Sequence, residues 1–264
     1  TITFGYDDLD RVIQTIDYYG NSVNYEYDKN SNIIKITYPN TNTVTYTYYE
    51  DNLLHTVTDW KEQTTTYSYR KDGLLSSTTY PNGTVCNLYY DGAGRMTNKE
   101  WKKSDGAIIN AYAFELDKLG NHTKEIKTEP FGVIPFDVES VTNTFNNENE
   151  ITSDGTNTFA FDKNGNNTSN GTATFSFDIY DRLTNVNDTG FNASYKYDAL
   201  NNRREKTVNG ITQRFVLDIL GLSKVLLETD ANNNAQNYYV YGLDLVARID
   251  ANNNTHYYHD DFRG

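Results

Sequence analysis

Residues 24–36 read NYEYDKNSNIIKI, and this stretch decides the fold. Tyr25 and Tyr27 are two residues apart, so in a β-strand both side chains point to the same face. The polar KNSN after Asp28 is typical of a turn, and the apolar run at 33–36 predicts a return strand. The stretch therefore predicts one β-hairpin with an aromatic face.

The same phrase recurs along the whole chain. The second aromatic residue stands at Tyr6, Tyr27, Tyr48, Tyr69 and Tyr90, a spacing of 21 residues at each step. Beyond residue 125 the phrase returns with less regular spacing. The positions assigned to the repeat are Tyr6, Asp7, Tyr25, Tyr27, Asp28, Tyr46, Tyr48, Tyr67, Tyr69, Tyr90, Asp91, Phe161, Asp162, Phe177, Asp178, Tyr195, Tyr197, Asp198 and Asp218. Repetition at this period is typical of stacked structural units.

A single hairpin cannot bury its aromatic face alone, so successive hairpins are expected to pair side by side. The sequence predicts an all-β fold, a continuous antiparallel sheet of tandem hairpins. The chain is expected to be one array over residues 1–264, with regular repeats at 1–125 and less regular repeats at 152–264. Residues 126–151, with Pro130 and Pro135, are expected to form an insertion or long loop because proline interrupts a sheet ladder.

Composition and charge narrow the function. The net charge of −13 argues against nucleic acid as a partner, because binding to phosphates depends on basic side chains. Cys86 is the single cysteine, so no disulfide framework or thiolate metal site is expected. No apolar run is long enough for a membrane helix. The chain starts at Thr1 without a signal peptide, so it is expected to be a piece of a longer protein whose targeting signals lie elsewhere.

The recurring aspartate allows two interpretations. It could form a ladder of carboxylates for metal binding or acid–base chemistry, or it could begin each turn by accepting backbone N–H groups. Catalysis needs one place, whereas this residue recurs in most units, so a structural role is favoured. His256 and His259 are three apart and point to opposite faces of a strand, which makes them poor joint ligands. No catalytic residue, metal or cofactor is expected.

Several phrases resemble the YD repeats of Rhs proteins, teneurins and the C component of insecticidal toxin complexes. They are YDDLDRV at 6–12, YYDGAGRM at 89–96, YKYDALNNRR at 195–204 and YYHDDFRG at 257–264. The last resembles the family phrase that opens the Rhs core, through Tyr257, Tyr258, His259, Asp261 and Gly264. The resemblance implies a sheet that spirals into a hollow shell around a C-terminal toxin or effector. By this comparison the chain is expected to be an open fragment of the sheet that forms the shell wall, and to end where the Rhs core begins.

The function expected is therefore a non-catalytic scaffold, secreted or on a bacterial cell surface, with an enclosed C-terminal toxin or effector segment as its partner. Open sheet edges also predict self-association, because end strands present unpaired backbone groups. One alternative is a cell-surface carbohydrate-binding or adhesion module that uses rows of exposed tyrosines. A second, less favoured alternative is a β-propeller, since two repeats approach the length of one blade.

Overall fold

The structure is a computed structural model that describes residues 1–128 and 142–260. The described residues form 25 β-strands and no helix, and hence no helix of the length and hydropathy needed to cross a bilayer. The chain packs as two compact units. The N-terminal unit comprises residues 3–134 with 238–264, and the central unit comprises residues 1–2 with 135–237.

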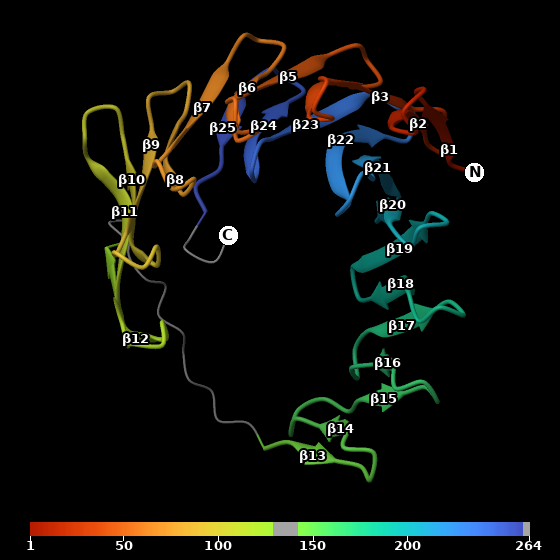
Figure 1. Ribbon diagram of the computed structural model, residues 1–264. Coiled ribbons are helices and arrows are strands. Elements are labelled where there is room, and N and C mark those ends of the chain that lie inside the picture. The colour runs from red at the N-terminus through yellow and green to blue at the C-terminus, as the bar shows by residue number, and fades with distance from the viewer. Residues whose placement is uncertain (129–141, 261–264) are drawn as a thin grey trace. The chain divides into compact units, whose positions relative to one another are not determined.

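The N-terminal unit is built on a 12-stranded antiparallel sheet in which each strand pairs with the next along the chain (Figure 1). Its strands are β1 (Thr3–Tyr6), β2 (Val12–Ile16), β3 (Ser22–Tyr27), β4 (Ile33–Thr37), β5 (Thr43–Tyr48), β6 (Leu54–Thr58), β7 (Thr64–Tyr69), β8 (Leu75–Thr79), β9 (Val85–Tyr90), β10 (Met96–Lys102), β11 (Ile108–Leu116) and β12 (His122–Thr128). The sheet is curved, and its end strands β1 and β12 do not pair with each other.

The last three strands of the chain end the 11-stranded sheet that begins at β15. They are β23 (Ala235–Tyr241), β24 (Leu245–Asp250) and β25 (Thr255–Tyr257). Residues 238–260 belong to the N-terminal unit, and β24 and β25 lie beside β5–β7 on the concave side of its sheet (Figure 1).

The central unit repeats the hairpin pattern with shorter strands at its start. Its strands are β13 (Thr144–Phe145), β14 (Ile151–Ser153), β15 (Ala160–Phe161), β16 (Asn167–Ser169), β17 (Thr174–Phe177), β18 (Leu183–Asp188), β19 (Phe191–Tyr197), β20 (Arg203–Val208), β21 (Ile211–Asp218) and β22 (Lys224–Asp230). β13 pairs with β14, and β15 to β22 pair in chain order.

Most of the hairpins close with the same turn, whereas β18–β19 and β20–β21 close in two residues, 189–190 and 209–210. In the β3–β4 hairpin the Asp28 N–H donates to the Asn32 carbonyl at 3.0 Å, and the Ser31 N–H donates to the Asp28 carbonyl at 3.2 Å. Ser31 has a φ of 67°, and Gly73 and Gly94 have φ of 82° and 76° at the same place in later repeats. This left-handed position explains the recurrent glycine and asparagine, which tolerate positive φ best.

Alternation along each strand places one set of side chains in the core. Tyr25 pairs with Ile36 across β3 and β4, and Tyr67 pairs with Thr78 across β7 and β8. All four are buried. The position that faces the first aromatic of each repeat is thus a core position.

The expected all-β fold of antiparallel hairpins in an open sheet is confirmed. The propeller alternative is wrong, because β1 to β12 form one continuous sheet where a propeller would have separate blades. The segment 126–151, expected as an insertion or loop, overlaps β12 at its start and contains β13, while 129–141, with Pro130 and Pro135, lies outside the described residues.

Candidate functional site: the repeat turns and the C-terminal seam

The turn aspartates use their carboxylates to hold the turn together. Asp28 Oδ1 accepts the backbone N–H groups of Asn30 and Asn32, both at 2.8 Å, and its Oδ2 accepts the Asn32 side chain at 2.8 Å. The same three-contact pattern is made by Asp7, Asp91, Asp162, Asp178 and Asp198. Asp218 is buried and accepts the Leu220 N–H at 3.0 Å. These carboxylates are committed to local backbone groups.

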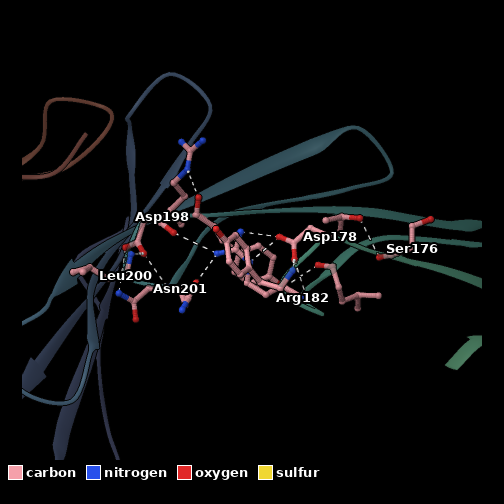
Figure 2. A network of polar contacts seen from close by, with 12 residues as sticks. Ser176, Asp178, Arg182, Asp198, Leu200 and Asn201 are labelled. Atoms are coloured by element: carbon pink, nitrogen blue, oxygen red, sulfur yellow. Dashed lines mark hydrogen bonds and ion pairs between the residues drawn. The ribbon is translucent and has the colours of Figure 1, made fainter. Parts of the chain in front are cut away.

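Arginine at the end of the phrase connects neighbouring hairpins (Figure 2). Arg182 Nε donates to Asp178 Oδ2 at 2.7 Å, and its Nη1 donates to Asn201 Oδ1 at 2.8 Å in the next turn. Its guanidinium also lies 4.7 Å from the centroid of the Tyr197 ring. Arg95 connects Asp91 to the Asp117 carbonyl in the same way. The phrase Tyr-Asp-x-x-x-Arg therefore joins two consecutive repeats.

The second tyrosine of the phrase also reaches the preceding repeat. Its hydroxyl donates to a backbone carbonyl of that repeat's return strand, at 2.7–2.9 Å. The donor–acceptor pairs are Tyr27–Val12, Tyr48–Ile33, Tyr69–Leu54, Tyr90–Leu75 and Tyr197–Leu183. Phe161 and Phe177 occupy the same repeat position without a hydroxyl. The first aromatics Tyr25 and Tyr67 are buried, and Tyr46 and Tyr195 are half-buried.

Tyr48→Phe is expected to lower the free energy of unfolding by about 0.5–1.5 kcal/mol, because the Ile33 carbonyl loses its donor. Tyr6→Phe is the matched control, since Tyr6 is 56% exposed and no earlier hairpin of the described sheet precedes it. Chemical denaturation of both variants measures the difference. Equal effects at the two positions would contradict a role for the hydroxyl between repeats.

The turn geometry also predicts sensitivity to acid. The pKa of Asp91 is lowered by the hydrogen bond from the Arg95 side chain, and that of Asp28 by the hydrogen bond from Asn32. An aspartate whose pKa is lowered in the folded state stabilises the fold at pH values above the ordinary aspartate pKa of about 3.9. The fold loses that stabilisation as the pH falls below this value. The midpoint of thermal unfolding is therefore expected to drop steeply below about pH 4. A flat profile in that range would contradict this prediction.

The C-terminal strands meet the concave face of the N-terminal sheet along an aromatic seam. We define the seam as Tyr38, Trp60, Tyr67, Tyr80, Lys99 and Trp101 together with the segment Tyr238–Asp260. At its first end the Tyr38 hydroxyl donates to the Tyr239 carbonyl at 2.7 Å, and the Trp60 and Tyr238 rings are 5.1 Å apart. Lys61 Nζ donates to the Asn253 carbonyl at 2.8 Å.

Gly242 lies at the middle of the seam, where the repeat elsewhere has aspartate. A Cβ at this position would lie 2.0 Å from the Tyr67 hydroxyl oxygen and 2.9 Å from Tyr67 Cζ. Tyr67 is 3% exposed, and its hydroxyl oxygen accepts the Leu243 N–H. The departure from the repeat therefore makes room for a core tyrosine of another strand.

The far end of the seam holds the residues just before the end of the described chain. Lys99 Nζ forms an ion pair with Asp260, and Trp101 Nε1 donates to the Asp260 carbonyl at 3.0 Å. The His259 ring lies over Trp101 with centroids 4.5 Å apart. Lys99 is 7% and Trp101 1% exposed. A buried cation is stabilised by such pairing.

Two repeat positions in the sequence indicate where the seam lies. Residues 15, 36, 57, 78 and 99 share one repeat position and read Thr, Ile, Val, Thr, Lys, so a lysine occupies a core position. Residues 17, 38, 59, 80 and 101 begin or precede the second turn and read Asp, Tyr, Asp, Tyr, Trp. The three aromatic residues at this position, Tyr38, Tyr80 and Trp101, all contact the C-terminal segment.

A small cavity of about 110 Å³ lies within the seam between β7–β10 and the C-terminal segment. Its lining includes Tyr67, Cys86, Lys99, Leu243 and Asp260. Burial raises the pKa of the Cys86 thiol to about 12, so the thiol stays protonated and unreactive at neutral pH.

The residues that resemble the core phrase take different places. Tyr257 and His259 point into the seam, where both lie within ring-contact distance of Tyr80, whereas Tyr258 is 39% exposed. Asp261 and Gly264 lie outside the described residues. Among residues 1–128 and 142–260 no three His, Cys, Asp or Glu side chains are grouped to hold a metal ion. Sequence reasoning missed the seam residues Tyr38, Trp60, Tyr80, Lys99, Trp101 and Asp260.

Comparisons with known proteins point to one family. The family described as teneurin YD-shell matches residues 14–129. The tRNA nuclease WapA of Bacillus subtilis strain 168 is 32% identical over 168 residues, which is 62% of this chain and 6% of the relative. The tRNA3(Ser)-specific nuclease WapA of Bacillus spizizenii is 33% identical over 141 residues, 52% of this chain and 6% of the relative. The chain thus spans a small part of the curated relatives it matches.

A solved structure extends the likeness in fold to nearly the whole chain. The Photorhabdus luminescens Tc holotoxin pore aligns with 98% of this chain and 16% of that chain, with a TM-score of 0.51 and 15% identity. At that identity the likeness concerns the fold alone. Together with the YD phrases and the hairpin array, the match over residues 14–129 makes the chain similar to proteins of the Rhs/YD-repeat family.

Proposed function

We propose that the chain is part of the wall of a shell that encloses a C-terminal toxin or effector segment in a secreted or cell-surface protein. A structural shell role is supported by the YD-shell family match. The observation that carries the enclosure is the seam, which brings the C-terminal segment back onto the concave face of the N-terminal sheet. A segment that continues from Asp260 would start on that face.

The wall itself is proposed to be non-catalytic. The turn carboxylates are engaged with backbone N–H groups, and the buried Lys99–Asp260 contact of the seam is an ion pair rather than an acid–base pair with room for a substrate. The relatives named as tRNA nucleases are matched over only 6% of their length, so their named activity need not reside in the matched part. The isolated chain is expected to leave tRNA intact; cleavage that persists after removal of contaminating nuclease would contradict this.

Protease protection tests the enclosure. The longer polypeptide in which we propose the chain lies is treated with a nonspecific protease, with and without mild denaturant. The segment downstream of residue 264 is expected to survive native digestion and to be cleaved once the wall opens. Equal cleavage rates in both conditions would overturn the enclosure.

We also propose that the isolated chain self-associates through its sheet edges. Every residue of β12 is exposed, and a free edge presents unpaired backbone groups. Light scattering over a wide concentration range is expected to show growing mass, and a monodisperse monomer throughout would contradict the proposal. A glycan-binding role is less favoured, because the hydroxyls of four repeat tyrosines already donate to carbonyls of the chain; they are Tyr27, Tyr48, Tyr69 and Tyr90.

A further inference from the structure

His259 occupies an unusual environment at the far end of the seam. Its ring lies 4.5 Å from Trp101 and 6.1 Å from Tyr80, measured between centroids. Its Nε2 atom is shielded from solvent and has no hydrogen-bond partner within residues 1–128 and 142–260. An uncharged imidazole tolerates such an aromatic setting, whereas an imidazolium would need an acceptor for each N–H and a counterion.

Among the residues that the structure describes, the charged and titratable groups around His259 offer no spare counterion. On its own segment Asp260 follows it, and that carboxylate is paired with Lys99 of β10. Tyr80 contacts its ring directly, and Cys86 on β9 lines the same cavity as Asp260. The Tyr257 ring contacts the Tyr80 ring. Two further carboxylates lie nearby: burial and the charge of Asp59 raise the pKa of Tyr257, and Asp244 lines the same cavity as Asp260.

We propose that mild acid unseats the C-terminal segment Tyr257–Asp260 from β10 by protonating His259. The seam would then be a pH-sensitive attachment point for whatever follows it. This inference rests on the proposed function, because its use depends on a downstream segment, but the unseating itself is a property of the described chain.

The direction of the pH effect follows from burial. Burial lowers the pKa of His259, and the neighbouring Asp260 carboxylate acts in the opposite sense. Because the pKa of His259 is lower while the segment is bound to β10, the bound form is favoured above the ordinary histidine pKa of about 6.5. The bound form loses that advantage as the pH falls below this value. The turn aspartates respond only below about pH 4, so the two transitions are separate.

Tryptophan fluorescence tests the proposal, because both tryptophans, Trp60 and Trp101, lie in the seam. In a Trp60→Phe background, Trp101 emission is expected to move to longer wavelength between about pH 7.5 and about pH 5, and to return on neutralisation. His259→Phe keeps a ring but cannot ionise, so it is expected to abolish the shift while circular dichroism stays unchanged. His256→Phe is the control, since the His256 side chain is 51% exposed.

The outcomes separate this inference from the proposed function. No shift in the parent, or a shift that persists in His259→Phe, would overturn it. Hydrogen exchange at residues 257–259 gives the same answer without the Trp60→Phe change. Protease protection at neutral pH without an acid shift would leave the enclosure intact and refute only the pH response. An acid shift without protection would refute the enclosure alone.

Discussion

Trp101→Ala is expected to lower the free energy of unfolding by about 3–5 kcal/mol, the range for removing a buried aromatic side chain. Trp101 is 1% exposed and contacts both Tyr80 and His259. Its Nε1 also holds the Asp260 carbonyl at 3.0 Å. The variant should therefore both weaken the sheet and release the C-terminal segment. Chemical denaturation measures the first effect, and hydrogen exchange at residues 257–260 measures the second.

Trp101→Phe separates packing from hydrogen bonding. Phenylalanine keeps a ring against His259 but cannot donate to Asp260, so the expected loss is about 1–2 kcal/mol. Trp60→Ala removes the other tryptophan, which is only half-buried, and should leave exchange at 257–260 unchanged. If Trp101→Ala destabilised the sheet but left the C-terminal amides protected, the seam would not depend on Trp101.

Gly242→Ala is expected to cost about 1–3 kcal/mol or more through overpacking. The added Cβ would lie 2.0 Å from the Tyr67 hydroxyl oxygen, and Tyr67 is enclosed by the core. Gly242→Asp, which restores the residue that the repeat has elsewhere, should be at least as damaging. A change toward the repeat consensus is thus predicted to be harmful at this position.

Gly92→Ala is the matched control, because a Cβ at Gly92 meets nothing within 4 Å. Its expected effect on unfolding is close to zero. Tyr67→Phe removes the overlapping oxygen but leaves Cζ 2.9 Å away, so it should restore part of the stability of Gly242→Ala. Strict additivity in this double-mutant cycle would show that the two residues do not interact.

The hairpins were predictable because their determinants are local. Tyr25, Tyr27 and Asp28 specify a strand and its turn within a dozen residues, and the residue at 31 completes the turn. The 21-residue period then implies pairing between neighbours in the chain. These features depend on contacts close in sequence. Alternation does not decide how deeply each tyrosine is buried, since Tyr25 and Tyr67 are buried whereas Tyr46 is half-buried at the same repeat position.

The seam was not predictable in the same way. Its contacts join residues far apart in the chain, as in the pair Trp101 and Asp260, which are separated by 159 positions. No local propensity indicates that Lys99, in a core position, pairs with a carboxylate three residues after the end of the last strand, β25. The resemblance drew attention to Tyr257, His259 and Asp261, whereas the residue that Lys99 binds is Asp260. The partner of Lys99 is therefore set by the position of the C-terminal segment against β10 and not by the family phrase.

The central claim is that the chain is a wall whose concave face receives the C-terminal segment. Electron cryomicroscopy of the longer polypeptide tests this most directly. We expect the YD hairpins as a curved sheet, with residues 238–260 seated against Tyr38, Tyr67, Tyr80 and Trp101, and density for the downstream segment on the enclosed side. A downstream segment on the convex side, or a C-terminal segment away from Trp101, would contradict the account.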